Sequence, residues 1–504
     1  MSLTDTRAVA LSSFDVPNGH ELIVRSCEDC ACPVSRERGE RRQLTEPLPG
    51  ELVHARDVLE LPLDDEHSVL FGALGNGGVV VVNEAARDIF SRFRRPCTIA
   101  DVVRAGHNPE VAASVIGRLV EQELIHQPGS GPAPRFGSSR ELTAWLHVTN
   151  ACNLRCPYCY VHKSNEGMDH SVAQDAVDSL VRSAVDHGFR SLRLKYAGGE
   201  ASLNAAVLLT LHDHAIARCD ETGLGLSSVL LSNGVAISDA LINDLKARDI
   251  RVMISLDGIG AAHDAQRPTV AGRPSSAMVV RTVDRLRSAG LAPHISITIT
   301  SRNVAAVAPV VRFALERELT FSFNFFRDND CAASFADLQY EEHSMVRGLL
   351  DAFAVIEELL PPWSVLGSIL DRGQLLEPRR RSCGVGDDYV VIDQNGQIAK
   401  CHMEIGTTLG DVRTVDPVRA IRDDTTGIRN LLVEDKEGCR GCTWRHWCSG
   451  GCAVATFRAT GRFDVRSPNC NIYKAIYPEA LRLESLRVFR FATRSTRTQD
   501  SRRH

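Results

Sequence analysis

The chain reads LTAWLHVTNACNLRCPYC from Leu142 to Cys159. The first eight of these residues are mostly apolar or β-branched, a composition typical of a buried strand. Asn150, Asn153 and Pro157 disfavour a helix in the residues that follow. The stretch therefore predicts a strand that ends in a loop, and loops carry functional side chains more often than the elements they connect.

Three cysteines lie on this predicted loop, namely Cys152, Cys156 and Cys159. Their thiolates could hold three irons of a [4Fe–4S] cluster and leave the fourth iron to a small molecule, because four cysteines are the usual complement. Zinc is the alternative metal. Zinc sites favour paired two-residue spacings, and no histidine here has the usual spacing for a fourth ligand. The spacing therefore favours an iron–sulfur cluster with one open iron.

The loop resembles the CxxxCx(aromatic)C signature of the radical S-adenosylmethionine (SAM) superfamily, with Tyr158 as the aromatic residue. The resemblance implies that SAM completes the cluster. It also implies that the reduced cluster splits SAM and releases a 5′-deoxyadenosyl radical, which abstracts hydrogen from a substrate. Iron–sulfur potentials span roughly −700 to +450 mV, and sulfonium cleavage needs the low end. A reductant such as flavodoxin or ferredoxin is therefore an expected partner.

Two further motifs resemble those with which this superfamily binds SAM. A GGE motif follows the strand-like stretch 192–196 and would hold the methionine amino group, because glycine allows close approach and a carboxylate pairs with an ammonium. An SLDG…HDxxR block would hold the SAM carboxylate through its serine and arginine. Many relatives have proline after GGE, whereas this chain has Ala201. The SAM-binding residues implied by the resemblance are Tyr158, Gly198, Gly199, Glu200, Ser232, Asn233, Ser255, Asp257 and Arg267.

Strand-like and helical stretches alternate between about residues 141 and 330, with helices predicted at 171–187 and 275–289. Recurrent βα units indicate a parallel sheet with active residues on the loops after the strand carboxyl ends. We therefore expect an α/β fold, and the resemblance implies the superfamily's partial (β/α)6 TIM barrel.

Seven later cysteines resemble the SPASM extension of the superfamily, which carries two auxiliary iron–sulfur clusters. Between the first two of them, twelve residues precede Gly396 and four follow it. The inner cluster lacks a fourth cysteine within residues 384–400, which implies an open iron, a non-cysteine ligand or fewer irons. The resemblance assigns Cys383, Cys401 and Cys452 to the inner cluster, and Cys439, Cys442, Cys448 and Cys470 to the outer one.

His402 follows Cys401, at a position where sulfatase-maturating relatives carry an aspartate thought to take a proton from the substrate. Histidine can accept a proton near neutral pH, and it can equally hydrogen-bond a cluster sulfur. Both roles stay open, and the change makes formylglycine formation the less favoured reaction. Asp387, Asp388 and Glu404 are other candidate bases nearby.

Residues 51–127 have the outline of a small winged-helix-like module. Two short strands flank a hairpin signal at 75–78, and helices are predicted at 84–93, 98–104 and 109–123. The module resembles the precursor-recognition (PqqD-like) domain of enzymes that mature ribosomally synthesised peptides. There the leader peptide adds as a strand to a sheet edge beside the last helix. A DNA-binding winged helix has the same outline, but no cluster of Lys or Arg marks the last helix, so no nucleic-acid partner is expected.

Composition sets further limits on the protein. The 504 residues are 43% hydrophobic and carry a net charge of −5, so neither nucleic acid nor anionic lipid should attract the chain. No apolar run approaches the roughly 20 residues of a membrane helix, and the start lacks a signal peptide, so a cytoplasmic protein is expected. The predicted divisions are a disordered segment (1–50), the recognition module (51–127), a linker (128–140), the barrel (141–330), a bridging region (331–380), the SPASM domain (381–486) and a frayed basic tail (487–504).

Three functions fit these observations. The first is a maturase that crosslinks a precursor peptide through a carbon–carbon or thioether bond. The second is another radical modification, either formylglycine formation or epimerisation. The third is a non-catalytic, metal-stapled winged-helix regulator that binds zinc and DNA. A metal site is possible at Cys27, Cys30 and Cys32, but no fourth ligand is obvious. Reactive or disordered thiols are therefore the preferred interpretation.

Overall fold

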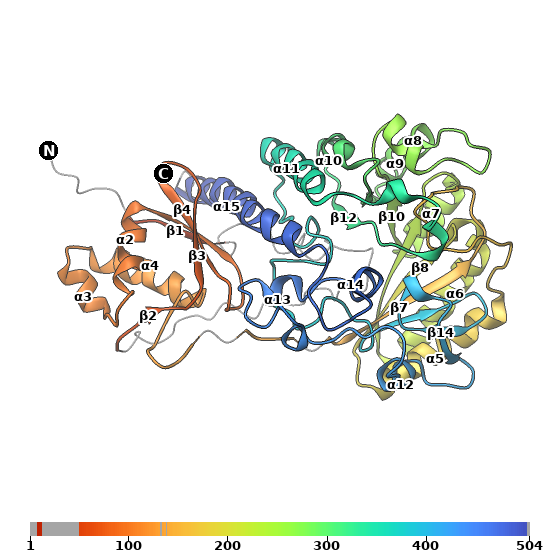
Figure 1. The fold of residues 1–504 in the computed structure, drawn as a ribbon, viewed down its shortest axis with the longest axis horizontal. Coiled ribbons are helices and arrows are strands. Elements are labelled where there is room, and N and C mark those ends of the chain that lie inside the picture. Colours follow the sequence, from red (N-terminus) through yellow and green to blue (C-terminus); the bar gives the residue numbers. More distant parts are fainter. Residues whose placement is uncertain (1–7, 13–49, 132–133, 138, 501–504) are drawn as a thin grey trace.

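The computed structural model describes residues 8–12, 50–131, 134–137 and 139–500. In Figure 1 the N-terminal module lies at one end of the long axis and the α/β region at the other, with α13 and α14 between them. Cys27, Cys30 and Cys32 lie outside the described residues. Within the described part of the chain, no helix is both long and apolar enough to cross a membrane.

The α/β region is built on a nine-stranded sheet in the order β12-β11-β10-β9-β8-β7-β13-β14-β15. Strands β7 to β12 are parallel and lie in chain order, which confirms the predicted α/β class and is consistent with a partial barrel. The six strands are β7 (Glu141–Thr149), β8 (Ser191–Gly198), β9 (Gly225–Ser232), β10 (Arg251–Ser255), β11 (His294–Ile299) and β12 (Phe321–Phe325).

Helices connect these strands, as parallel neighbours require. Their apolar faces are buried, as in α5, which begins where the Asp169 carboxylate accepts a hydrogen bond from Val172 N. β7 is buried along its whole length, which explains its continuous apolar run. The helices are α5 (His170–Asp186), α6 (Ala205–Thr222), α7 (Asp239–Ala247), α8 (Ala261–Gln266), α9 (Ser276–Ser288) and α10 (Val307–Glu316).

The cysteine-rich segment extends the same sheet, an arrangement the sequence patterns did not predict. β13 (Tyr389–Ile392) pairs parallel with β7, and β14 (Gln397–Ala399) and β15 (Thr408–Asp411) follow antiparallel. Cys401, two residues after β14, therefore lies on the sheet that carries the cysteine loop. The helices of this segment are α12 (Pro417–Asp423), α13 (Arg445–Cys448) and α14 (Ala453–Thr460).

The N-terminal module is an antiparallel sheet covered by three helices. The predicted hairpin is present, and Asn83 caps the first helix by accepting from Ala86 N. The sheet has four strands in the order β1-β5-β4-β3, and a separate pair, β2 and β6, lies beside it. The elements are β1 (Ala10–Ser12), β2 (Val53–His54), β3 (Val58–Pro62), β4 (His67–Gly72), β5 (Val79–Asn83), α2 (Glu84–Arg92), α3 (Ile99–Arg104), α4 (Pro109–Glu121) and β6 (Ile125–His126).

The hairpin tip of this module docks on the cysteine-rich segment. Trp447 Nε1 donates to Ala73 O at 2.9 Å, and the Trp447 and Phe71 rings lie 5.0 Å apart. A Cβ added at Gly77, whose φ is +81°, would stand 2.6 Å from the Trp447 ring. Only glycine fits this contact, so the predicted turn also serves as a docking surface.

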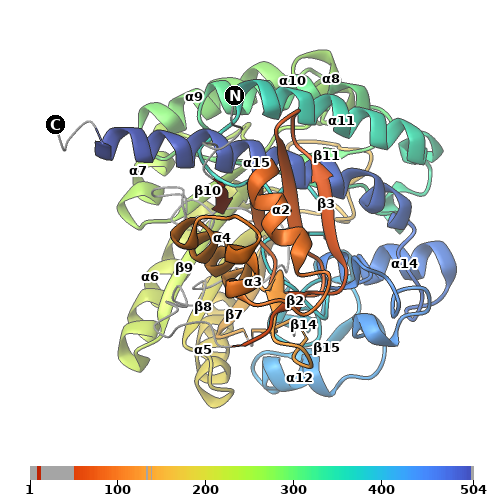
Figure 2. The same cartoon turned by 90° about the vertical axis from the view of Figure 1, so that its left-hand side faces the viewer.

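The prediction of a frayed tail is wrong for its first residues, from Arg487 to Ala492. α15 (Cys470–Asp500) continues through it, and Val488 and Ala492 are buried. Figure 2 shows α15 passing beside α11 (Glu342–Leu359) and the N-terminal sheet. The helix is therefore held by packing against other parts of the chain, which its basic composition does not reveal.

Candidate functional site

A cavity opens at the carboxyl ends of the parallel strands. This is the edge at which βα folds place their active residues. The structure brings most of the predicted catalytic-cluster and SAM residues to its wall. They are Cys152, Cys156, Tyr158, Cys159, Gly198, Gly199, Glu200, Ser232, Asn233, Ser255 and Arg267.

Two of the three cysteines of the β7 loop have a hydrogen-bond donor directed at their sulfur. Lys163 Nζ lies 3.1 Å from Cys159 Sγ, and Asn233 Nδ2 lies 3.8 Å from Cys152 Sγ. Burial raises the pKa of Cys156 to about 12, although the Arg267 charge opposes this. Three thiols with N–H groups aimed at two of them are a donor set that suits an iron–sulfur cluster, whose sulfurs accept hydrogen bonds. Among the described residues, no three His, Cys, Asp or Glu side chains gather as ligands of a single metal ion.

The GGE motif lies against this loop through its backbone. Gly199 N donates to Thr149 O at 2.7 Å, and Glu200 N donates to Ala151 O at 2.8 Å. The Glu200 carboxylate is buried. It accepts hydrogen bonds from Ser232 Oγ at 2.7 Å and from the backbone N of Asn233, also at 2.7 Å. Glu200 thus joins the ends of β8 and β9 beside the cysteine loop.

Replacing Gly199 by alanine should separate these two loops. The added Cβ would stand 2.3 Å from Ala151 O, a backbone atom that cannot move aside cheaply. We expect a loss of stability of about 1–3 kcal/mol and at least tenfold weaker SAM binding, measured by denaturant unfolding and equilibrium dialysis. Gly406→Ala is the control, because nothing lies within 4 Å of its Cβ. Equal SAM binding by the two variants would contradict this role of the close approach.

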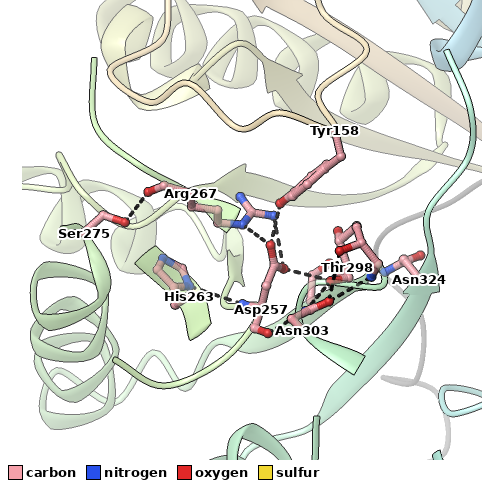
Figure 3. A network of polar contacts seen from close by, with 10 residues as sticks. Tyr158, Asp257, His263, Arg267, Ser275, Thr298, Asn303 and Asn324 are labelled. Atoms are coloured by element: carbon pink, nitrogen blue, oxygen red, sulfur yellow. Dashed lines mark hydrogen bonds and ion pairs between the residues drawn. The ribbon is translucent and has the colours of Figure 1, made fainter. Parts of the chain in front are cut away.

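Arg267 is held at the cavity by a buried acidic partner (Figure 3). Its Nε donates to Asp257 Oδ2 at 2.6 Å, and the Tyr158 hydroxyl donates to the same oxygen at 2.5 Å. Asp257 is fully buried and also accepts from Thr298 N at 2.9 Å. Arg267 lines the cavity, whereas Asp257 does not. The role of Asp257 is therefore to orient the Arg267 guanidinium, which is the group that can contact a ligand.

The seven later cysteines fall into two groups of thiols that influence one another electrostatically. Burial and the proximity of Cys452 and Cys383 raise the pKa of Cys401. Cys448 has the other three cysteines, Cys439, Cys442 and Cys470, as its neighbours. The assignment of the two groups to an inner and an outer cluster stays a prediction. Arg327 adjoins the inner set, since its Nε lies 3.3 Å from Cys452 Sγ.

His402 lies on the cavity wall near the inner set. It stacks on Trp145, with ring centroids 4.4 Å apart, and its Nδ1 is 2.8 Å from the Tyr389 hydroxyl. Burial, followed by the positive charges of Arg372 and Arg327, lowers the pKa of His402 well below its usual value. Burial and these positive charges therefore favour the neutral form of the His402 imidazole.

The other three candidate bases lie away from the cavity. The backbone of Asp388 accepts from Thr143 N near the start of β7, which is the opposite edge of the sheet. Asp387 pairs with Arg422 and Glu404 with Arg458. None of the three lines the cavity.

Several cavity residues belong to no motif that the sequence offered. Arg327 is anchored by Asp371 at 2.6 Å, and Arg372 also lines the wall. Lys163 follows Cys159 by four residues. Asn324 lies at the end of β12, so the rule that active residues follow strand ends could have selected it together with Arg327.

Comparisons with known proteins bear directly on this site. Residues 146–304 match the model of the Radical SAM superfamily. The chain is 21% identical over 328 residues to a cysteine-type anaerobic sulfatase-maturating enzyme of Clostridium perfringens, covering 60% of this chain and 86% of that enzyme. It is 24% identical over 339 residues to the PqqA peptide cyclase of Xanthomonas euvesicatoria, covering 65% and 87%. An uncharacterized protein of Methanocaldococcus jannaschii is 28% identical over 173 residues, a match that spans 34% of this chain and 57% of that protein.

A solved structure shares the fold. Native anSMEcpe with bound AdoMet and the Cp18Cys peptide aligns with a TM-score of 0.56 at 18% identity, covering 70% of this chain and 99% of that one. Residues 146–304 therefore form a radical SAM domain. Because these relatives are enzymes, the protein is an enzyme that contains a radical SAM domain, and the non-catalytic regulator is set aside.

Proposed function

We propose that the protein is a maturase that abstracts hydrogen from a ribosomally synthesised precursor peptide and installs an intrapeptide crosslink, either a carbon–carbon or a thioether bond. One observation carries the proposal. The same cavity is lined by the β7 cysteine loop and by Arg327, Arg372 and His402, which adjoin the inner cysteine set. A peptide side chain in this cavity would meet both the cysteine loop and residues that adjoin the inner cysteine set.

The residues present fit the cofactors that this function needs. Cys152, Cys156 and Cys159 would hold a [4Fe–4S] cluster, and Glu200, Ser255 and Arg267 would hold SAM at the same cavity. The inner and outer cysteine sets would hold two auxiliary iron–sulfur clusters. When bound, these groups supply a 5′-deoxyadenosyl radical and an acceptor for the electron that the peptide loses.

The chain's own residues would prepare the peptide for the crosslink. Forming one crosslink removes two hydrogens, one as an atom and the other as a proton and an electron. Trp145, Phe326 and Met403 give the cavity apolar walls that exclude water. His402 has a lowered pKa, so its proposed role is to hydrogen-bond the substrate or a cluster sulfur, with proton transfer as the weaker alternative.

The N-terminal module would select the substrate. Its docking through Trp447 attaches it to the cysteine-rich segment, so a leader bound to residues 51–127 would be tethered within the same molecule as the cavity. The relative named PqqA peptide cyclase supports a peptide substrate. A reductant such as flavodoxin or ferredoxin and a cytoplasmic location complete the proposal.

Mass spectrometry of the peptide tests this function. The reconstituted enzyme is incubated anaerobically with SAM, reductant and a precursor peptide encoded beside it. We expect a loss of two hydrogens that requires the leader, with fragmentation locating the new bond. An unchanged peptide mass alongside 5′-deoxyadenosine formation, for every precursor encoded nearby, would contradict crosslinking.

Formylglycine formation is the second candidate, because the sulfatase-maturating relative is covered over 86% of its length. It would convert a cysteine or serine side chain into an aldehyde, which a hydrazide reagent would label. His402, in place of an aspartate, favours the crosslink. Labelled product would decide for formylglycine, and unlabelled product lacking two hydrogens would decide for the crosslink.

Replacing Cys442 by alanine should separate SAM cleavage from product formation. The outer cysteine set does not line the cavity, so cleavage of SAM should stay within about tenfold of the native rate. Product formation should fall at least about 100-fold. Loss of a cluster ligand should have a larger effect than loss of a residue that only hydrogen-bonds a metal ligand. Chromatography of 5′-deoxyadenosine and of peptide measures both. Cys97→Ala is the matched control in the N-terminal module, and product formation by Cys442→Ala at the rate of this control would refute a catalytic role for the outer cluster.

A further inference from the structure

One strand of the N-terminal sheet comes from outside the module. β1 adds antiparallel to β5, with Ala10 opposite Val82 and Ser12 opposite Val80. The backbone N of Asn83 donates to Val9 O at 3.2 Å, and the Asn83 side chain accepts from Val9 N at 3.0 Å. The edge of β5 is therefore filled by a segment from much earlier in the chain, as the separation of 74 positions between Val9 and Asn83 shows.

The position of β1 is a slot for an extended segment. β1 contacts α4 on one side and α15 on the other. Ala8 and Ala10 pack against the buried cluster that includes the module helices, whereas Leu11 packs against the larger cluster that includes α15. Ser12 is fully buried. Alternate side chains thus enter opposite faces, as in recognition of a peptide by strand addition.

The opposite edge of the sheet is not suited to receive a strand. β3 ends in Pro62, which has no N–H to donate, and Glu60 is exposed in the middle of the strand. Proline and exposed charge are the devices that keep edge strands from pairing. The β5 edge is therefore the one at which this sheet accepts a further strand.

β1 is also short enough to be replaced. Three residues form few ladder hydrogen bonds, so the strand depends on being part of the same chain. A tether of this kind gives an effective concentration of about millimolar, which a free peptide of moderate affinity can overcome.

We propose that the β5 edge is an exchangeable strand-addition site at which residues 9–12 compete with the leader segment of the precursor peptide. The partner is an extended segment with small side chains toward α4 and a larger apolar one toward α15. The inference rests on the proposed function for the identity of this partner. Leader binding then requires that β1 leave the edge.

A binding experiment with the full-length protein tests the exchange. The probe is a fluorescent peptide that copies residues 6–14, and anisotropy measures its affinity for the native protein and for Leu11→Asp. The substitution places a charge where Leu11 meets the apolar cluster, so it should release β1. We expect the variant to bind the probe at least about tenfold more tightly than the native protein, because the tethered competitor is weakened. Leu350→Asp, on the exposed face of α11, should bind the probe as the native protein does.

A reversible lock provides a second readout if Leu11→Asp does not fold. Ala10 and Val82 face each other across the ladder, so a disulfide between Ala10→Cys and Val82→Cys would hold β1 in place. Oxidation should weaken binding of the precursor at least tenfold, and a thiol reductant should restore it. Val82→Cys alone is the control and should respond to neither treatment.

The outcomes separate this inference from the proposed function. The exchange site would be overturned if the native protein and a folded Leu11→Asp variant bound the probe equally. It would also be overturned if the oxidised disulfide left binding of the precursor unchanged. Binding of the probe to the released variant without displacement by the precursor would overturn the leader as its partner. The probe copies this chain, so its binding does not depend on any maturase activity.

Discussion

Cys156→Ala should abolish both SAM cleavage and peptide modification. Cys156 is one of three cysteines on the β7 loop, so replacing it leaves only two of the three proposed ligands of the catalytic cluster. We expect each activity to fall at least about 1000-fold, well beyond the 10- to 100-fold typical of losing a group behind a metal ligand. Chromatography of 5′-deoxyadenosine and of the peptide measures the two rates.

The matched control is Cys219→Ala. Cys219 is a buried thiol on α6 that does not line the cavity. Its replacement should leave both activities unchanged apart from a small loss of stability, and iron content should fall only in Cys156→Ala. SAM cleavage by Cys156→Ala at the rate of the control would show that the radical source lies elsewhere.

Asp257→Asn should remove the support of Arg267. The amide keeps the size of the carboxylate but leaves a guanidinium buried without its counter-charge, since Arg267 is 8% exposed and Asp257 is fully buried. Breaking a buried pair in this way costs about 3–5 kcal/mol of stability. SAM affinity should fall at least about 100-fold, because Arg267 would no longer face the cavity in one orientation. Urea unfolding and equilibrium dialysis measure the two effects.

An exposed ion pair of similar geometry is the control for this substitution. Asp239 lies 2.5 Å from Arg285, but its side chain is 84% exposed. Asp239→Asn should cost no more than about 1 kcal/mol, because water screens such pairs. If Asp257→Asn proved as mild as the control and bound SAM normally, the buried network would have no part in ligand binding.

The sequence predicted those elements whose pattern is local. The strand and cysteine loop at 142–159 were predicted to within a residue, because a continuously buried strand and loop-forming Asn and Pro leave a clear signature. The helix predicted at 171–187 spans 170–186 for the same reason. The SAM motifs also follow strand ends, so sheet order alone brings them to one cavity.

The features that the sequence did not reveal depend on distant partners. β1 has three residues and pairs with β5 far along the chain, so no periodicity could mark it. The last part of α15 is basic and is stabilised by the N-terminal sheet. Arg327 and Arg372 belong to no motif. Arg327 reaches the cavity because it follows the end of β12, and Arg372 because part of the bridging region runs beside the cavity.

The central claim is that radicals generated at the β7 loop act on a peptide in the adjoining cavity. Transfer of deuterium tests it most directly: the enzyme is given reductant, SAM and a precursor peptide that carries deuterium on its Cα and side-chain carbons, and the 5′-deoxyadenosine is analysed by mass spectrometry. We predict deuterium in the 5′-deoxyadenosine whenever the precursor is modified. Unlabelled 5′-deoxyadenosine from a reaction that yields modified precursor, or no 5′-deoxyadenosine from a protein with verified clusters, would contradict the account.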